Sequence, residues 1–269
     1  MVPLETSGFS TRYKWIKLLR EGGQGVVWLV KKPDDNLYQV AKSLKNVSRG
    51  KMTWCGIRKR MIPDEILLSE SLDHPNISKL KEIYLEQDRW IIIMEYFPNF
   101  IDLFDYINLT GPMGTSDAKI IISKVMDVLN YLVSIKIDHR DIKDENILYN
   151  HRTKEIKLID FGSASYFTEN SYTKLQGTEM YTPPEFHRNG KYRALPGISW
   201  AVGCLTYILL NGKCPFESKQ DIIEYKTLTF KDEMDKLTRH FLQSLMEENE
   251  TKRMPPANIP YHPWVKNQN

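Results

Sequence analysis

Residues 139–146 read His-Arg-Asp-Ile-Lys-Asp-Glu-Asn and carry three side chains whose types suit one reaction. The carboxylate of Asp141 can accept the proton of a hydroxyl group, and the ammonium of Lys143 can neutralise a transferring phosphoryl group. The carboxamide of Asn146 can bind a divalent cation. Together these groups indicate phosphoryl transfer to a hydroxyl. A polar loop that caps a helix would account for the occurrence of His-Arg-Asp alone, but it does not account for the types and spacing of all eight residues.

Upstream of this stretch, two charged residues lie on elements that the sequence also predicts. Residues 37–42 alternate in polarity and end in Val-Ala-Lys, which indicates a strand that carries Lys42. Residues 63–68 begin with proline and two acids, which is typical of a helix start and places Glu65 in the first turn. Taken alone, Lys42 is most simply a surface lysine of an edge strand, and Glu65 a solvated helix residue.

Further motifs follow in order along the chain. Asp-Phe-Gly at 160–162 comes after the apolar run 156–159, so Asp160 is expected at the end of a strand. Gly-Thr at 177–178 and Pro-Pro-Glu at 183–185 come next. Near the start, residues 19–27 read Leu-Arg-Glu-Gly-Gly-Gln-Gly-Val-Val, a glycine-rich loop that on its own would be most simply a hairpin turn.

In this order the motifs resemble those of eukaryotic serine/threonine protein kinases, over about residues 12–266. Residues 101–106, 139–146 and 158–164 look most similar to the Pim kinases and the PAS-domain kinase of the calcium/calmodulin-dependent group. Lys143 is typical of the serine/threonine branch, because tyrosine kinases usually carry Ala-Ala-Arg or Arg-Ala-Ala in this region.

The resemblance implies an α+β fold of two lobes within a single protein kinase domain. An N-terminal lobe of about residues 1–95, an antiparallel sheet with one main helix, would be joined by a hinge at about 95–98 to a larger, mostly helical lobe at about 99–269. The spacing of apolar residues agrees with this division into lobes, because strand-like alternation gives way to helical spacing from Asp102 onward. A core helix is predicted from Ser116, with apolar residues from Ile120 to Leu132, and residues 200–209 predict a buried central helix.

The family's catalytic roles transfer to matching positions of this chain. Asp141 would be the catalytic base and Lys143 would neutralise the phosphoryl group, while Thr178 would hydrogen-bond both. Lys42 would hold the α- and β-phosphates of ATP, with Glu65 as its ion-pair partner. The metal ligands, expected for Mg²⁺, would be Asn146 and Asp160.

The ATP site is also implied by the resemblance, although each apolar member has a simpler interpretation as core. Gly22 and Gly25 would let backbone amides approach the phosphates, and the Glu95 carbonyl and Phe97 amide would bind adenine. The expected nucleotide-binding residues are Leu19, Gly22, Gly25, Val27, Ala41, Lys42, Met94, Glu95, Phe97, Leu148 and Asp160.

Two departures from the family pattern leave a second hypothesis open. Arg20 replaces the first glycine of the loop, and Ile198 replaces an aspartate that braces the catalytic loop in most kinases. A pseudokinase or signalling scaffold with impaired catalysis is therefore the alternative to an active kinase. A small-molecule phosphotransferase is disfavoured, because residues 177–178 and 183–185 match a peptide-receiving segment. Glu185 is expected to form a buried ion pair with Arg253.

Regulation and substrate choice are predicted from charged positions. Lys174 lies where many kinases carry a phosphorylated residue; it cannot take a phosphate there and is expected to repel Arg140, so activity without activation-loop phosphorylation is predicted. A preference for substrates with upstream Arg or Lys is also predicted. It depends on four acids that match substrate-binding positions or, alternatively, form a solvated surface: Asp102, Asp105, Asp144 and Glu145.

Bulk properties exclude few functions. A net charge of +3 is too small to favour nucleic acid or membrane surfaces as partners. No apolar run reaches the ~20 residues of a membrane span, and no signal peptide is evident. Cys55, Cys204 and Cys214 lack metal-ligand spacing, which favours reduced thiols. We therefore expect a monomeric protein of the cytoplasm or the nucleus whose partners are protein substrates.

Overall fold

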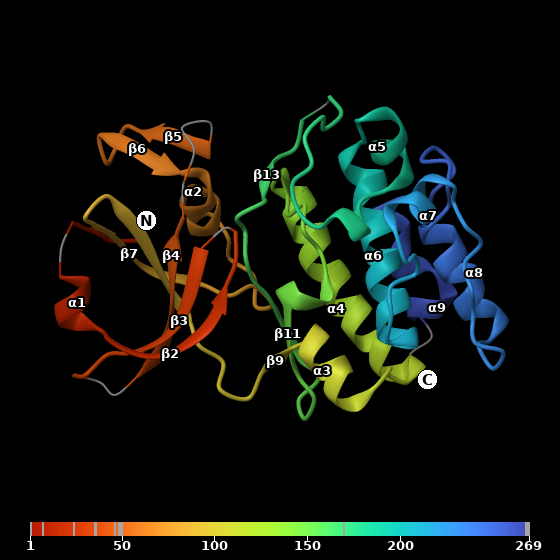
Figure 1. Cartoon of the computed structure of the whole chain (residues 1–269), viewed down its shortest axis with the longest axis horizontal. Coiled ribbons are helices and arrows are strands. Elements are labelled where there is room, and N and C mark those ends of the chain that lie inside the picture. Colours follow the sequence, from red (N-terminus) through yellow and green to blue (C-terminus); the bar gives the residue numbers. More distant parts are fainter. Residues whose placement is uncertain are drawn as a thin grey trace. The chain divides into compact units, whose positions relative to one another are not determined.

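The computed structural model describes residues 2–6, 8–23, 25–34, 37–45, 47, 51–168 and 170–266 (Figure 1). The chain divides into two compact units, Met1–Asn99 and Phe100–Asn269. The sequence places the corresponding boundary at a hinge of about 95–98. An N-terminal unit rich in antiparallel strands and a helical C-terminal unit confirm the predicted α+β class.

The N-terminal unit is built on a sheet with the strand order β1-β7-β8-β4-β3-β2 among the described residues. Neighbouring strands are antiparallel, except that β1 runs parallel to β7. A separate hairpin of β5 and β6 precedes α2. The elements are β1 (Leu4–Glu5), α1 (Phe9–Arg12), β2 (Lys14–Glu21), β3 (Gly25–Lys31), β4 (Tyr38–Leu44), β5 (Met52–Cys55), β6 (Arg60–Pro63), α2 (Asp64–Glu70), β7 (Leu80–Glu86) and β8 (Arg89–Glu95).

Alternation along the central strands decides which face each side chain occupies. On β8, Ile91 and Ile93 join one buried cluster, while Ile92 joins the other, which contains Ile66 of α2. Lys42 of β4 lies directly opposite Ile92 in the β-sheet register. Lys42 therefore shares the face that α2 covers. Since β4 lies between β3 and β8, the interpretation of Lys42 as an edge-strand lysine is wrong.

The C-terminal unit consists mainly of helices, with short strands around the loops that carry the motifs (Figure 1). Its helices are α3 (Leu103–Thr110), α4 (Thr115–Ser134), α5 (Pro184–Asn189), α6 (Ala194–Asn211), α7 (Lys219–Ile223), α8 (Lys236–Leu245) and α9 (Pro263–Lys266). Its strands are β9 (Ile101–Asp102), β10 (Ile137–Asp138), β11 (Ile147–Asn150), β12 (Glu155–Leu158) and β13 (Ser165–Tyr166). Short 3-10 turns cover Asp144–Asn146, Glu179–Tyr181 and Pro256–Tyr261.

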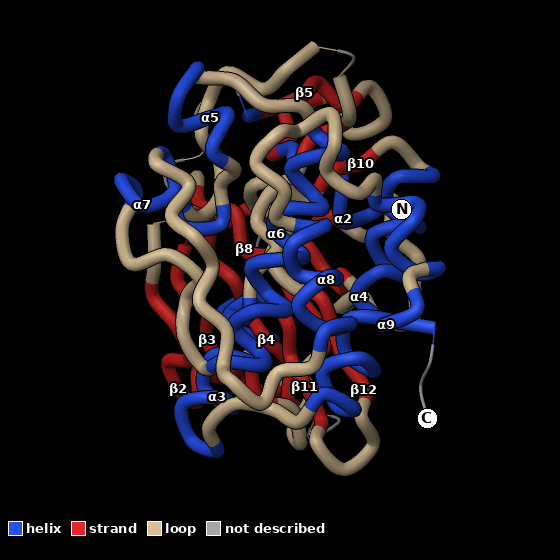
Figure 2. The backbone as a smooth tube through the Cα atoms, turned by 90° about the vertical axis from the view of Figure 1, so that its right-hand side faces the viewer, coloured by secondary structure: helices blue, strands red, loops and turns tan. Residues whose placement is uncertain are grey.

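Helix α6 forms the centre of this unit, as its apolar sequence predicts. In the described part of the chain it is the one helix that is long and apolar enough to cross a membrane, but 78% of that stretch is buried inside the protein. Gly203 lets α8 approach closely, because a Cβ there would lie 2.5 Å from the Met246 side chain. Figure 2 shows α6 and α8 side by side, in agreement with their packing.

Helix α4 packs its predicted apolar face inward, with one difference. Ile120 is only half-buried, whereas Ile121, Ile122, Val125 and Met126 are fully buried. Successive helical residues are rotated by about 100°, so Ile120 lies about 160° around the helix from Ile122, on the opposite side from the buried face. The helix begins at Thr115, one residue before the predicted start.

Candidate active site

The catalytic loop begins at the end of β10 and is held by a buried histidine. His139 is fully buried; its Nδ1 accepts a hydrogen bond from the Asp141 amide at 3.3 Å. Its Nε2 lies 3.2 Å from the carbonyl oxygen of Ile159 and must therefore carry the proton. Burial lowers the pKa of His139, which favours this neutral form. The ring packs edge-on against Phe161 at 4.8 Å, so His139 links the catalytic loop to the Asp-Phe-Gly segment.

Asp141, Lys143 and Thr178 form a continuous hydrogen-bonded chain, as the resemblance implied. The Lys143 ammonium donates to the Thr178 hydroxyl at 2.8 Å, and that hydroxyl donates to Oδ1 of Asp141 at 2.9 Å. The ammonium also lies 3.6 Å from Oδ2 of Asp141. This arrangement fixes the Asp141 carboxylate and keeps a positive charge beside it, which suits proton acceptance and phosphoryl binding at one place.

Asn146 and Asp160 are brought together by the hairpin of β11 and β12. Ile147 pairs with Leu158, and the Ile159 amide donates to the Asn146 carbonyl at 3.0 Å, so the flanking residues of the two strands are neighbours. The Asn146 side-chain nitrogen donates to the Asp141 carbonyl at 2.8 Å and to its Oδ2 at 3.0 Å. Its amide oxygen is consequently the atom that can meet a cation.

This donor set fits the divalent cation that the resemblance implies. An amide oxygen and a carboxylate are hard oxygen ligands of the kind that Mg²⁺ accepts. The described residues contain no cluster of three or more His, Cys, Asp or Glu side chains that could hold a metal by themselves. Two protein oxygens completed by phosphate oxygens are the usual arrangement for Mg²⁺ bound with a nucleotide.

Lys42 and Glu65 form a buried ion pair within the N-terminal unit. The Lys42 ammonium lies 2.7 Å from Oε1 of Glu65, and the two side chains are only 4% and 12% exposed. Strand alternation places Lys42 under α2, and the helix start at Asp64 puts Glu65 in its first turn. The predicted pair is present, and its burial holds the Lys42 side chain in one position.

The glycine loop connects β2 and β3, and its glycines meet different constraints. A Cβ on Gly25 would lie 2.5 Å from the Ser43 carbonyl, so packing of β3 on β4 already requires glycine there. Nothing lies within 4 Å of a Cβ built on Gly22 or Gly23. Arg20 pairs with Val27 directly after a register irregularity between Leu18 and Arg20, so its substitution for glycine leaves the hairpin formed. Gln24 lies outside the described residues.

The other expected nucleotide-binding residues are distributed over both units. Leu19 is 43% exposed on β2, and Val27 is half-buried on β3. Ala41 is fully buried in a core cluster, as its simpler interpretation predicts. Met94 and Glu95 end β8, and Phe97 follows that strand. In the C-terminal unit, Leu148 lies on β11, where it pairs with Lys157 and Asp102.

The four acids proposed for substrate binding differ in environment. Asp102 is the N-cap of α3, since its Oδ1 accepts from the Asp105 amide at 2.8 Å. Asp144 is only 6% exposed and accepts from the Tyr181 hydroxyl at 3.0 Å. Asp105 is exposed and Glu145 is half-buried. The structure therefore gives Asp102 and Asp144 structural roles that the sequence did not indicate, and it leaves Asp105 accessible.

The activation segment, residues 160–185, contacts the rest of the unit at several points that the sequence did not reveal. Tyr172 and Tyr192 form a backbone bridge, with N–O distances of 2.8 and 3.1 Å. Arg140 donates to the Lys174 carbonyl at 2.9 Å. The expected charge repulsion between the Lys174 and Arg140 side chains therefore does not keep the two residues apart, because the Lys174 backbone provides an attractive contact. A Cβ on Gly177, whose φ is +95°, would lie 2.3 Å from the Arg140 carbonyl.

The predicted ion pair between Glu185 and Arg253 is present and bidentate. Its two N–O distances are 2.7 and 2.9 Å, and the Arg253 side chain is 0% exposed. Arg253 also donates to the Glu247 and Pro196 carbonyls and lies over the Trp200 ring at 5.0 Å. The pair anchors the end of the activation segment to the core of the unit.

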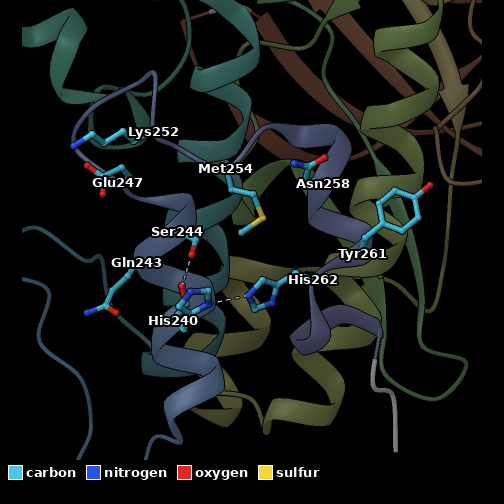
Figure 3. A pocket seen from close by; sticks show the side chains of 9 residues that line it. All are labelled: His240, Gln243, Ser244, Glu247, Lys252, Met254, Asn258, Tyr261 and His262. Carbon is cyan, nitrogen blue, oxygen red and sulfur yellow. Dashed lines mark hydrogen bonds between the residues drawn. The ribbon is translucent and has the colours of Figure 1, made fainter.

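An open pocket of about 480 Å³ lies beside α8, away from the motifs (Figure 3). Nine residues line it, and none of them belongs to the predicted site. The His262 Nδ1 accepts from the Trp264 amide at 3.1 Å, so its Nε2 donates to Nδ1 of His240 at 3.0 Å. Trp264 is fully buried, and its indole nitrogen donates to the Thr238 hydroxyl at 2.8 Å.

Comparison with known proteins agrees with the geometry. The protein kinase domain family model matches residues 13–265. The chain is 33% identical to serine/threonine-protein kinase pim-2 of Danio rerio, over 96% of this chain and 86% of that protein. It is 30% identical to serine/threonine-protein kinase prk-2 of Caenorhabditis elegans, over 97% of this chain and 60% of that protein. It is 31% identical to calcium-dependent protein kinase 3 of Plasmodium berghei, over 91% of this chain and 45% of that protein. The chain therefore belongs to the eukaryotic protein serine/threonine kinases, near the Pim and calcium/calmodulin-dependent branch.

Proposed function

We propose that this protein kinase phosphorylates Ser and Thr hydroxyls of proteins with Mg·ATP, that it prefers basic residues before the acceptor, and that it is active without a phosphate on its activation segment. The observation that carries the proposal is the hydrogen-bonded chain of Lys143, Thr178 and Asp141. The alternative of a scaffold without catalysis gains no support, because Lys42 and Glu65 are paired and Asn146 is bonded to Asp141.

The residues of the chain divide the chemistry among them. Asp141 accepts the proton as the substrate hydroxyl oxygen bonds to the γ-phosphorus and the bond from that phosphorus to ADP breaks. Thr178 holds the carboxylate in place, and Lys143 stabilises the negative charge of the phosphoryl group. Lys42, fixed by Glu65, positions the phosphates. Bound Mg²⁺, held by Asn146 and Asp160, would neutralise charge on the β- and γ-phosphates.

Activity without activation-segment phosphorylation is supported by the contacts of Arg140. A phosphate usually orders this segment by forming charge-assisted bonds to such an arginine. Here Arg140 already binds the Lys174 carbonyl and lies over the Tyr172 ring. Thr173, the neighbouring hydroxyl residue, is exposed. These contacts of Arg140 can therefore order the activation segment without a phosphate.

Radiolabelled-phosphate transfer to a peptide library tests the activity. Lys42→Met and Asp141→Asn should each lower kcat/KM at least about 100-fold, because lost positioning and charge stabilisation each remove several kcal/mol of barrier reduction. Matched controls are Lys79→Met, which removes an exposed ion pair with Asp73, and Asp127→Asn on the exposed side of α4. A parent that transfers no phosphate with Mg²⁺ present would establish the scaffold instead, and near-parent rates for a site variant would remove that residue's role.

The same library tests substrate preference. Enrichment of Arg or Lys at the positions two to five before the acceptor is expected, because carboxylates pair well with guanidinium groups. The double variant Asp102→Asn, Asp105→Asn removes two charges while asparagine retains N-cap function on α3. It should weaken the preference, whereas Asp127→Asn should leave it unchanged. An unbiased library profile for the parent would contradict the proposed preference.

A further inference from the structure

Strand β10 brings a carboxylate to the catalytic loop that the phosphoryl-transfer chemistry does not use. Asp138 is 4% exposed, and its Oδ1 accepts a hydrogen bond from the backbone amide of Arg140 at 3.1 Å. No role was predicted for Asp138 from the sequence, although an aspartate within the apolar end of a strand is unusual. A buried carboxylate is costly unless it is hydrogen-bonded, so its partner indicates what it does.

The residue that Asp138 contacts is in a conformation that needs support. Arg140 has a φ of +63°, in the left-handed region that is unfavourable for a residue other than glycine. Such conformations persist where the surroundings hold them. The Arg140 amide is held by Asp138, and its carbonyl lies against Gly177, where only glycine leaves room. The next residue along the chain is Asp141.

Helix α6 offers no acceptor to this amide from its side of the loop. Asp138, Arg140, Asp141 and Ile198 of α6 line the same small cavity of about 40 Å³. The Ile198 side chain is buried and has no hydrogen-bonding atom. Ile198 therefore cannot accept from the Arg140 amide, and the acceptor that this amide uses is Asp138 of β10.

We infer that Asp138 is a positioning residue for catalysis: its carboxylate fixes the Arg140 peptide from β10, in place of an acceptor on α6, and thereby sets the direction of Asp141. The inference rests on the proposed kinase activity, since its effect is exerted through the catalytic base. The simpler alternative is a local turn in which an aspartate bonds the amide two residues later and contributes only to folding.

Two substitutions of Asp138 separate these alternatives. Asp138→Asn keeps an oxygen acceptor of the same shape, whereas Asp138→Leu fills the space without one. We expect Asp138→Asn to retain kcat within about threefold, and Asp138→Leu to lower kcat about tenfold or more. The KM for ATP should change less than about twofold in both, because Lys42 and Glu65 lie in the N-terminal unit. Hydrogen exchange of the Arg140 amide should be faster than in the parent for Asp138→Leu but not for Asp138→Asn.

Two further variants complete the test. Asp235→Leu removes a comparable bond, from the Thr238 amide to Asp235 at the start of α8, and controls for general destabilisation. Adding Ile198→Asp to Asp138→Leu returns an acceptor to the same cavity and should recover part of the lost kcat. The inference is overturned if the kcat of Asp138→Leu equals that of Asp235→Leu. It is also overturned if kcat falls as far in Asp138→Asn as in Asp138→Leu. A parent without kinase activity would remove the proposed function, and exchange at Arg140 would still decide whether Asp138 holds this peptide.

Discussion

The Arg140 guanidinium lies over the ring of Tyr172, with 3.9 Å between its central carbon and the ring centroid. A cation on an aromatic face contributes about 0.5–2 kcal/mol, depending on how far water is excluded. Tyr172 is buried, and its backbone pairs with Tyr192. The Tyr192 ring in turn packs on α6, since a Cβ on Gly197 would lie 2.8 Å from it. The activation segment is thus connected to both the catalytic loop and the central helix.

Replacing Tyr172 should show how much this contact contributes. Tyr172→Leu keeps the backbone bridge but removes the aromatic face, so the kcat/KM of phosphate-free enzyme should fall about fivefold. Tyr172→Phe retains a ring and should stay within about twofold of the parent. Steady-state kinetics on phosphatase-treated protein make the comparison. Equal rates for the leucine and phenylalanine variants would mean that the ring does not help to order the segment.

Phosphorylation of Thr173 should matter little. Thr173 is exposed, and the Arg140 side chain is already engaged by Tyr172 and the Lys174 carbonyl. Thr173→Ala and phosphatase treatment should each change kcat/KM less than about twofold. Mass spectrometry would verify that the treated enzyme carries no phosphate. A large loss of activity whose recovery follows phosphate on Thr173 would show that the segment does switch.

The difference between what the sequence predicted and what it missed has a physical cause. Lys42, Glu65, Asp141 and Thr178 were predicted because each belongs to a motif that resembles a protein kinase motif, and the resemblance implies its role and its partner. Asp144 also belongs to such a motif, yet its partner Tyr181 is 37 residues away. A contact of that kind depends on tertiary packing, which a linear pattern does not contain.

Backbone atoms account for other differences. Lys174 appeared repulsive toward Arg140 because sequence reasoning considered its side chain, whereas the structure uses its carbonyl. Gly25 appeared to be required by nucleotide binding, whereas the Ser43 carbonyl already requires it. Asp138 could have been noticed as a charged residue in an apolar strand, but its partner, the Arg140 amide, depends on a left-handed turn that the sequence does not reveal.

Gly177 should not tolerate a side chain. Gly177→Ala would add a strained φ and place a Cβ 2.3 Å from the Arg140 carbonyl and 3.0 Å from Oδ1 of Asp141. Movement of the catalytic loop should lower kcat at least about tenfold. Gly190→Ala is a matched control, since Gly190 has a φ of +67° but open space around it. Kinase assays on both folded variants test this, and similar kcat values would mean that the close approach is unimportant.

The buried ion pair of Arg253 should dominate the stability of its surroundings. Arg253→Met leaves the Glu185 carboxylate without its partner, which typically costs about 3–5 kcal/mol in the free energy of unfolding. Lys154→Met breaks a partly exposed pair of the same length with Asp117 and should cost less than about 1 kcal/mol. Urea unfolding of the two variants gives the comparison. A cost for Arg253→Met no larger than that for Lys154→Met would show that the bidentate geometry adds little.

The stability of the protein should depend on pH through Asp138. Burial raises the pKa of this carboxyl from its ordinary value of 3.8 to about 6, although Arg140 and the Tyr172 hydroxyl oppose the shift. The folded state therefore holds a proton that the unfolded state has released between about pH 4 and 6, so this group's contribution to stability is lost as pH rises through that window.

Asp138→Asn cannot titrate at this position but keeps the hydrogen bond to the Arg140 amide. The free energy of unfolding of the parent, relative to this variant, should therefore fall by at most about 3 kcal/mol between pH 4 and pH 7 and level off above pH 6. Urea unfolding of the two proteins at several pH values measures the difference, in which the other titrating groups cancel. If the difference stays constant across this range, the Asp138 carboxyl titrates alike in the folded and unfolded states, and burial does not raise its pKa.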